Sequence, residues 1–218
     1  MQSLFSPDSK IMRTMSRVGD LMVLNLLFLA TCIPLVTIGA SSAALYTVCF
    51  RFGTEKEGKL VRTYFRAFRD NLRQGAILWL IVLFFGGASA ANAWIFYSAQ
   101  GLLHWAFLPF AVLFVLVLLL DGYIFPLLSQ FSNSVGYTLK NALLLSVGYL
   151  PRSLLIAALN VFPFVLLLLD LYQFLQLGFL WAALYFSAAA YGNAALLKKV
   201  FAPYKGEQTE KEDLSDDP

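Results

Sequence analysis

Long runs of apolar residues, separated by short polar segments, make up most of the chain. Four runs are long enough, or nearly so, to cross the hydrocarbon core of a bilayer, which needs about 20 apolar residues in a helix. They cover residues 76–97, 105 to about 129, 153–169 and 174–197. Strands of a membrane barrel would instead alternate between apolar and polar residues over about ten residues. The pattern therefore predicts an all-α, polytopic helical membrane protein.

The first apolar run, residues 18–50, is longer than one crossing requires and is interrupted at Pro34 and Gly39. Pro removes a backbone donor and Gly weakens a helix, so a break is expected there. The run is either one long kinked helix or a short hairpin that enters the membrane and returns. The break is then the turn of the hairpin or, alternatively, a substrate or ion site in unwound backbone, as in transporters with discontinuous helices.

The distribution of Lys and Arg favours the hairpin, which gives about six membrane segments. Short loops that carry these residues stay in the cytoplasm. With a hairpin, all 16 Lys and Arg lie in segments on one side, and the loops at residues 98–104 and 170–173 contain none. A single crossing would put Lys10, Arg13 and Arg17 on the opposite side. We therefore expect both termini in the cytoplasm, with residues 1–17 as a basic cytoplasmic N-terminus.

A cleaved signal peptide is the alternative for the N-terminal region. A basic start, an apolar run and the small residues at 40–44 are typical of one. Cleavage would leave the basic stretch 51–73 outside, which reverses the charge asymmetry, so the hairpin is favoured. We expect a single membrane domain over residues 18–200. The acidic, polar tail at residues 201–218 is expected to be disordered in the cytoplasm.

Residues 60–74 predict an amphipathic helix that lies in the membrane plane. Its apolar positions follow helical spacing, and four arginines run down the other face: Arg62, Arg66, Arg69 and Arg73. Such a helix anchors to anionic lipid headgroups. The same arginines also suit docking of a cytoplasmic partner, and the two roles are compatible. Nucleic acid is not an expected partner, because the arginine face would compete with headgroups and there is no second basic surface.

Asp121, inside the run that begins at residue 105, is an ionisable residue within a predicted span. A buried charge is costly, so proton transfer or substrate contact is one hypothesis. The other is structural: Asp121 caps a helix segment or pairs with an arginine near the interface. Polar amides also occur in the spans and are expected to bond between helices: Asn25, Asn92, Asn160 and Asn193.

Composition agrees with a membrane protein and argues against an enzyme. The chain is 59% hydrophobic and 13% charged, whereas soluble domains have roughly 45–50% apolar and about 25% charged residues. A soluble fold and overall disorder are therefore excluded. The sequence lacks a phosphate-binding loop, a Gly-x-Ser-x-Gly elbow and a His-Glu-x-x-His motif, and it contains a single histidine, His104. We expect no catalytic residues, no cofactor and no metal.

Several segments resemble the YesL-like family of bacterial integral membrane proteins. The most specific are a Pro-x-x-Thr-x-Gly pattern at residues 34–39 and a Phe-x-x-Asn pattern at residues 68–71, and the resemblance spans roughly residues 21–151. It implies a multi-pass protein of the bacterial cytoplasmic (plasma) membrane. Genes of this family commonly lie beside carbohydrate importers of the ATP-binding-cassette (ABC) type. That implies an accessory or regulatory subunit whose partners are ABC permease and ATPase subunits.

The residues themselves leave a second function open. A stand-alone small-molecule transporter would use the broken helix at Pro34 and Gly39 together with Asp121.

Overall fold

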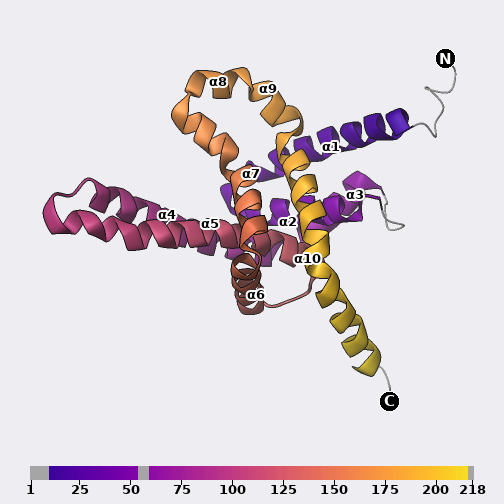
Figure 1. Ribbon diagram of the computed structural model, residues 1–218. Helices are drawn as coiled ribbons and strands as arrows, with labels where there is room; N and C mark the ends of the chain where they lie inside the picture. Colours follow the sequence, from indigo (N-terminus) through magenta and orange to yellow (C-terminus); the bar gives the residue numbers. More distant parts are fainter. Residues whose placement is uncertain (1–9, 54–58, 216–218) are drawn as a thin grey trace.

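The computed structural model describes residues 10–53 and 59–215, and side chains for residues 14–53 and 59–204. These residues form helices joined by short turns (Figure 1). In chain order the elements are α1 (Lys10–Cys32), η2 (Leu35–Thr37), α2 (Ile38–Arg51), α3 (Leu60–Asp70), α4 (Leu72–Tyr97), η3 (Gly101–Ala106), α5 (Phe107–Gln130), α6 (Val135–Gly148), α7 (Leu150–Leu169), α8 (Leu171–Gln176), α9 (Gly178–Leu180), η4 (Trp181–Tyr185) and α10 (Phe186–Ser215).

Five stretches of the described chain are long and apolar enough to cross a membrane. They are Thr14–Cys32, Leu72–Tyr97, Gly101–Gln130, Leu150–Leu169 and Gly178–Tyr204. A further apolar helix, Leu35–Arg51, is shorter. Its α2 portion is about 21 Å long at 1.5 Å per residue, against a hydrocarbon core of about 30 Å. The prediction of an all-α, polytopic membrane protein is confirmed, with five crossing-length helices and one short helix making up the six predicted segments.

The first apolar run forms a hairpin rather than one kinked helix. The guanidinium carbon of Arg17, in α1, lies 4.3 Å from the centroid of the Phe52 ring, which follows α2. At the opposite end, the Thr37 hydroxyl donates hydrogen bonds to the carbonyls of Thr31 (2.6 Å) and Pro34 (2.7 Å). These bonds occupy backbone acceptors where α1 ends, so the turn satisfies its own polar groups.

Two longer hairpins project from the centre of the molecule (Figure 1). α4 and α5 lie side by side, and the rings of Phe96 and Phe110 stack with centroids 5.4 Å apart near the tip. α7 and α10 are joined through α8 and α9 at the second tip. Both tips coincide with the loops that contain no Lys or Arg. In Figure 1 they lie on the left and at the top, away from α3, α6 and the C-terminal end of α10.

The core lies around the short helix α2, which contacts α1, α3, α4, α5 and α10. Its residues from Gly39 to Phe50 are buried, apart from the half-buried Ser42. Small side chains at Ala40, Ala43 and Ala44 let neighbouring helices approach closely, as is usual where helices pack in lipid. The helix that is too short to cross is therefore the helix around which the others are arranged.

Asn25 joins α1 to the π-helical turn η4. Its Nδ2 donates to the carbonyls of Trp181 (3.0 Å) and Ala182 (2.7 Å), and its Oδ1 accepts from the Ser187 backbone N–H (3.0 Å). A π turn departs from the regular hydrogen-bonding pattern of an α-helix. Here the fully buried side-chain amide of Asn25 supplies hydrogen bonds to the backbone of the turn. The interhelical role predicted for Asn25 is confirmed. The one predicted for Asn92 is wrong, because its Nδ2 donates to Ala88 of the same helix (2.7 Å).

α10 continues past the last apolar residues to Ser215. The helix thus includes residues 201–215 of the tail whose composition predicts disorder, and residues 216–218 lie outside the described residues. The segment contains Glu, Lys and Gln, which are good helix formers when a helix is already nucleated.

Candidate functional site

α3 is held against the hairpin of α1 and α2 by the two buried residues Tyr64 and Ala67. The Tyr64 hydroxyl lies 2.6 Å from Thr31 Oγ1 at the end of α1. Burial raises the pKa of the Tyr64 phenol, so the side chain stays neutral at physiological pH. Its hydrogen bond with Thr31 is therefore independent of pH in that range. Part of the apolar face predicted to meet lipid therefore packs on the protein, while Val61 and Phe65 remain exposed.

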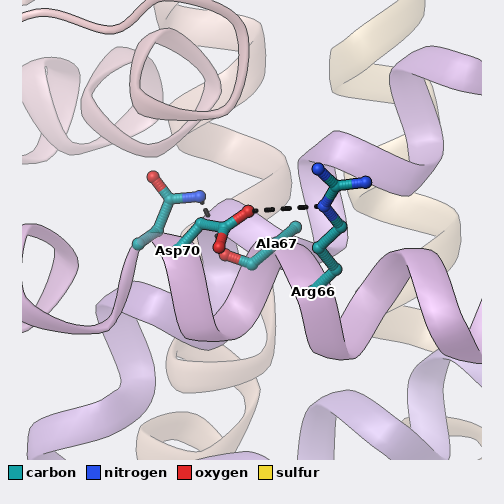
Figure 2. A network of polar contacts seen from close by, with 4 residues as sticks. Arg66, Ala67 and Asp70 are labelled. Atoms are coloured by element: carbon teal, nitrogen blue, oxygen red, sulfur yellow. Dashed lines mark hydrogen bonds and ion pairs between the residues drawn. The ribbon is translucent and has the colours of Figure 1, made fainter.

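The outward face of α3 carries Arg62, Arg66 and Arg69, all exposed. Arg66 Nε lies 3.9 Å from Asp70 Oδ2, one helical turn away (Figure 2). These two side chains are 85% and 68% exposed, so water screens the pair and it adds little stability. The guanidinium groups are displayed on a helix of fixed position, which suits recognition of a negatively charged surface.

The helix boundary differs from the predicted 60–74. α3 ends at Asp70 because Asn71 caps it: the Asn71 side chain (2.9 Å) and backbone N–H (3.1 Å) both donate to the Ala67 carbonyl. Arg73 therefore lies in the first turn of α4, where it is exposed. Three of the four predicted arginines share the face of α3, and the fourth belongs to the next helix.

An open polar pocket of about 610 Å³ lies beside these arginines, and we call it the basic pocket. It is lined by Thr47 and Arg51 of α2, by Arg62, Thr63, Arg66, Ala67 and Asp70 of α3, and by Asn71 and Ser129. Among the described residues that line it, three carry a guanidinium group and one a carboxylate, so this lining has an excess of positive charge. Guanidinium groups bind carboxylates and phosphates through paired hydrogen bonds, and an anionic group is the chemistry that this pocket fits.

The structure places Pro34 and Gly39 in different parts of the hairpin. Pro34 is exposed in the turn after α1, whereas Gly39 is buried inside α2. A Cβ at Gly39 would overlap the carbonyl oxygen of Gly75 and lie 2.8 Å from the Cβ of Trp79. Gly39 thus serves close packing of α2 on α4, which corrects its prediction as a break residue. The break falls at residues 33–37.

Asp121 lines a partly open cavity of about 200 Å³ between the helices, and we call it the Asp121 cavity. Asp121 lies nine residues before the end of α5, in the second half of the apolar span Gly101–Gln130. Its Oδ1 is buried and has no hydrogen-bond partner among the described residues. The cavity is lined by Phe28, Ile38, Ser42, Leu45, Tyr46, Trp79, Asp121, Phe125, Leu159, Asn160, Phe164, Tyr185, Phe186, Ala189 and Ala190.

The polar side chains of Trp79, Tyr46 and Asn160 line this cavity together with Asp121. Trp79 Nε1 is buried and, within the described part of the chain, has no hydrogen-bond partner. Tyr46 and Asn160 are linked by Asn193, whose Nδ2 donates to Asn160 Oδ1 (2.9 Å) and to the Tyr46 hydroxyl (3.2 Å). The interhelical roles predicted for Asn160 and Asn193 are confirmed. Their bonds connect α2, α7 and α10 around the cavity.

Sequence reasoning missed Trp79 and Tyr46 as cavity residues. One signal was available for Trp79: it lies well inside α4, whereas Trp in membrane proteins is enriched at the membrane–water boundary. Nothing in the pattern marked Tyr46, because a Tyr in an apolar helix is also a common core residue.

The fold and the exposed apolar helices define a multi-pass helical membrane protein. Residues 21–93 match the model of a family described as "Protein of unknown function, DUF624". The match covers less than half of the chain, from α1 to within α4, and includes Trp79 and the arginines of α3 but not Asp121. It lies inside the stretch that resembles the YesL-like family and is consistent with that resemblance, without naming it. No curated protein and no solved structure matches the chain.

Proposed function

We propose that this chain is a non-enzymatic accessory or regulatory subunit of a carbohydrate ABC importer in the bacterial cytoplasmic membrane. The observation that carries the proposal is the face of α3, where Arg62, Arg66 and Arg69 are exposed on a helix fixed by Tyr64. The choice of a carbohydrate importer as partner comes from the resemblance to the YesL-like family.

In this proposal α3 lies at the inner surface of the membrane. Val61 and Phe65, about 47% and 46% exposed, contact acyl chains. The arginines meet anionic headgroups, and they present the basic pocket to acidic side chains of the permease or ATPase subunit. Lipid anchoring and partner docking use the same face, so the headgroups position the helix for its partner.

Replacing Arg62, Arg66 and Arg69 together with Gln is expected to lower recovery of the importer subunits about tenfold. Three exposed charge pairs of roughly 0.5 kcal/mol each sum to about 1.5 kcal/mol, which corresponds to that factor. The measurement is affinity purification from native membranes of cells that express the whole operon, with quantification of permease and ATPase subunits.

A double variant, Lys140→Gln with Lys199→Gln, is the matched control, because both side chains are exposed and lie outside α3. It should leave recovery unchanged. Purification of the wild-type chain alone from such cells would count against the accessory function.

The Asp121 cavity favours a second candidate, a stand-alone small-molecule transporter. A buried carboxylate oxygen within a membrane span is a typical substrate or proton contact in transporters. If this function holds, proteoliposomes containing only this chain will take up small neutral solutes, and Asp121→Asn will reduce the rate at least about tenfold. Wild-type proteoliposomes no more permeable than empty ones would exclude transport by this chain alone.

A further inference from the structure

We propose that the Asp121 cavity binds a small neutral polyol, a molecule of about six to eight non-hydrogen atoms with several hydroxyl groups. The size follows from the volume. An engineered cavity of about 150 Å³ in another protein holds benzene, which has six such atoms. The Asp121 cavity, at about 200 Å³, has room for slightly more.

The chemical class follows from two of the three buried polar atoms that lack partners within the described chain. Asp121 Oδ1 is an acceptor and Trp79 Nε1 is a donor, and both residues line the Asp121 cavity. The third atom, Asn193 Oδ1, belongs to a residue that does not line it. A hydroxyl group donates one hydrogen bond and accepts others, so a polyol satisfies both atoms. In hydrocarbon, a polar group without a partner is costly, so a ligand that satisfies both is strongly preferred over one that satisfies either alone.

Charged and purely apolar ligands satisfy at most one side of this pair. An ammonium cation pairs with the Asp121 carboxyl but has no lone pair for the Trp79 N–H. A carboxylate or phosphate accepts from Trp79 but places a second acceptor charge beside the Asp121 carboxyl. A purely apolar ligand leaves both atoms unpaired. The combination of a donor and an acceptor therefore favours a neutral molecule that both donates and accepts hydrogen bonds, and a polyol does so at each hydroxyl group.

The remaining walls fit the same class. Tyr46 and Asn160, held in place by Asn193, supply further polar groups to the lining of the cavity. The rings of Phe28, Phe125 and Phe186 cover the rest with apolar surface, against which the C–H groups of a polyol pack. Ligand pockets commonly combine a mostly apolar lining with a few placed polar groups.

This site is separate from the proposed docking surface, because the Asp121 cavity and the basic pocket have no lining residue in common. The residues that line the Asp121 cavity come from α1, α2, α4, α5, α7, η4 and α10, and none comes from α3. A polyol bound there would be a regulatory ligand in an accessory subunit and a substrate in a transporter, so failure of either function leaves the binding site testable by itself.

The test is equilibrium binding of radiolabelled glycerol and erythritol to the full-length protein in lipid nanodiscs. Tetramethylammonium, acetate and benzene are measured in parallel. We expect saturable polyol binding, weakened roughly five- to tenfold by Trp79→Phe, which removes one hydrogen bond but keeps a ring. Trp94→Phe, on the exposed end of the same helix, should leave the affinity unchanged.

A spectroscopic readout keeps the proposal falsifiable even if Trp79→Phe destabilises the fold. With ¹⁵N-labelled Trp, the indole N–H signal of Trp79 should shift on addition of polyol and remain in place with tetramethylammonium or benzene. Absence of saturable polyol binding, equal affinity in Trp79→Phe, or a Trp79 signal that polyol does not move would each overturn the proposal. Tighter binding of tetramethylammonium than of either polyol would identify a cation site instead.

Discussion

Replacement of Gly75 by Ala is expected to lower the free energy of unfolding by about 3 kcal/mol, at the upper end of the range for overpacked cores. A Cβ at Gly75 would lie 2.7 Å from the backbone nitrogen of Ala40 and 2.9 Å from its Cα. These are backbone atoms of α2 and cannot move aside as a flexible side chain would. Gly39 lies on the α2 side of this contact, so α2 and α4 meet at a pair of glycines.

Gly87→Ala is the matched control in the same helix, because no atom lies within 4 Å of the added Cβ. There Ala should stabilise the helix by up to about 1 kcal/mol. Unfolding by SDS in mixed micelles, followed by circular dichroism, measures both variants. A loss of stability in Gly87→Ala equal to that in Gly75→Ala would show that the close contact between α2 and α4 is not the cause.

The Gly75 contact also bears on the cavity. Trp79 lies one turn beyond Gly75, and its Cβ is close to the position that a Cβ on Gly39 would take. Widening the α2–α4 contact would therefore displace the indole that lines the Asp121 cavity. We expect the close approach of these helices to serve both stability and the placement of Trp79.

Asn25→Leu is expected to destabilise the protein by about 3 kcal/mol. The substitution keeps the side-chain volume but removes three hydrogen bonds, to the Trp181 and Ala182 carbonyls and from the Ser187 N–H, each worth about 1 kcal/mol. Interhelical bonds in membranes average about 0.6 kcal/mol, which would give about 2 kcal/mol in total. The larger value is expected because the π turn offers its backbone few other partners.

The comparison variant for Asn25 is Asn92→Leu. Asn92 is half-buried and bonds only within α4 in the described structure, to Ala88, so its replacement should change the unfolding free energy by less than about 0.5 kcal/mol. Both variants are measured by the same SDS titration. If Asn25→Leu lost no more stability than Asn92→Leu, the bridge between α1 and η4 would not be a stabilising feature.

The helices and their approximate limits could be predicted from sequence because the lipid environment requires helical structure in a long apolar run. In hydrocarbon, every backbone polar group must be bonded within a helix or a barrel, so a long apolar run has almost no other option. The arginine face of α3 could also be predicted, because the helical spacing of its arginines is visible in the sequence. Asn71 ends α3 before Arg73 because a side-chain cap competes with helix continuation, and a pattern of apolar positions does not register a cap.

Features that depend on which helices meet could not be predicted. Gly39 signals a helix break in sequence, yet its role depends on Gly75, which is 36 positions away in the chain. Trp79 and Asp121 lie on different helices, and only tertiary packing places their unpartnered atoms at one cavity. The π turn at residues 181–185 has no reliable sequence signal, so the partners of Asn25 could not be named.

Docking of a cytoplasmic partner requires α3, with both chain ends, to lie on the cytoplasmic side of the membrane. Maleimide labelling of intact cells tests this most directly, with single cysteines introduced after replacing Cys32 and Cys49 by Ala. Gly101→Cys and Gln173→Cys, at the tips of the two long hairpins, should react with a membrane-impermeant reagent. Lys59→Cys, directly before α3, and Ser132→Cys, both exposed in the fold, should react only after permeabilisation. Labelling of Lys59→Cys from outside would contradict the placement.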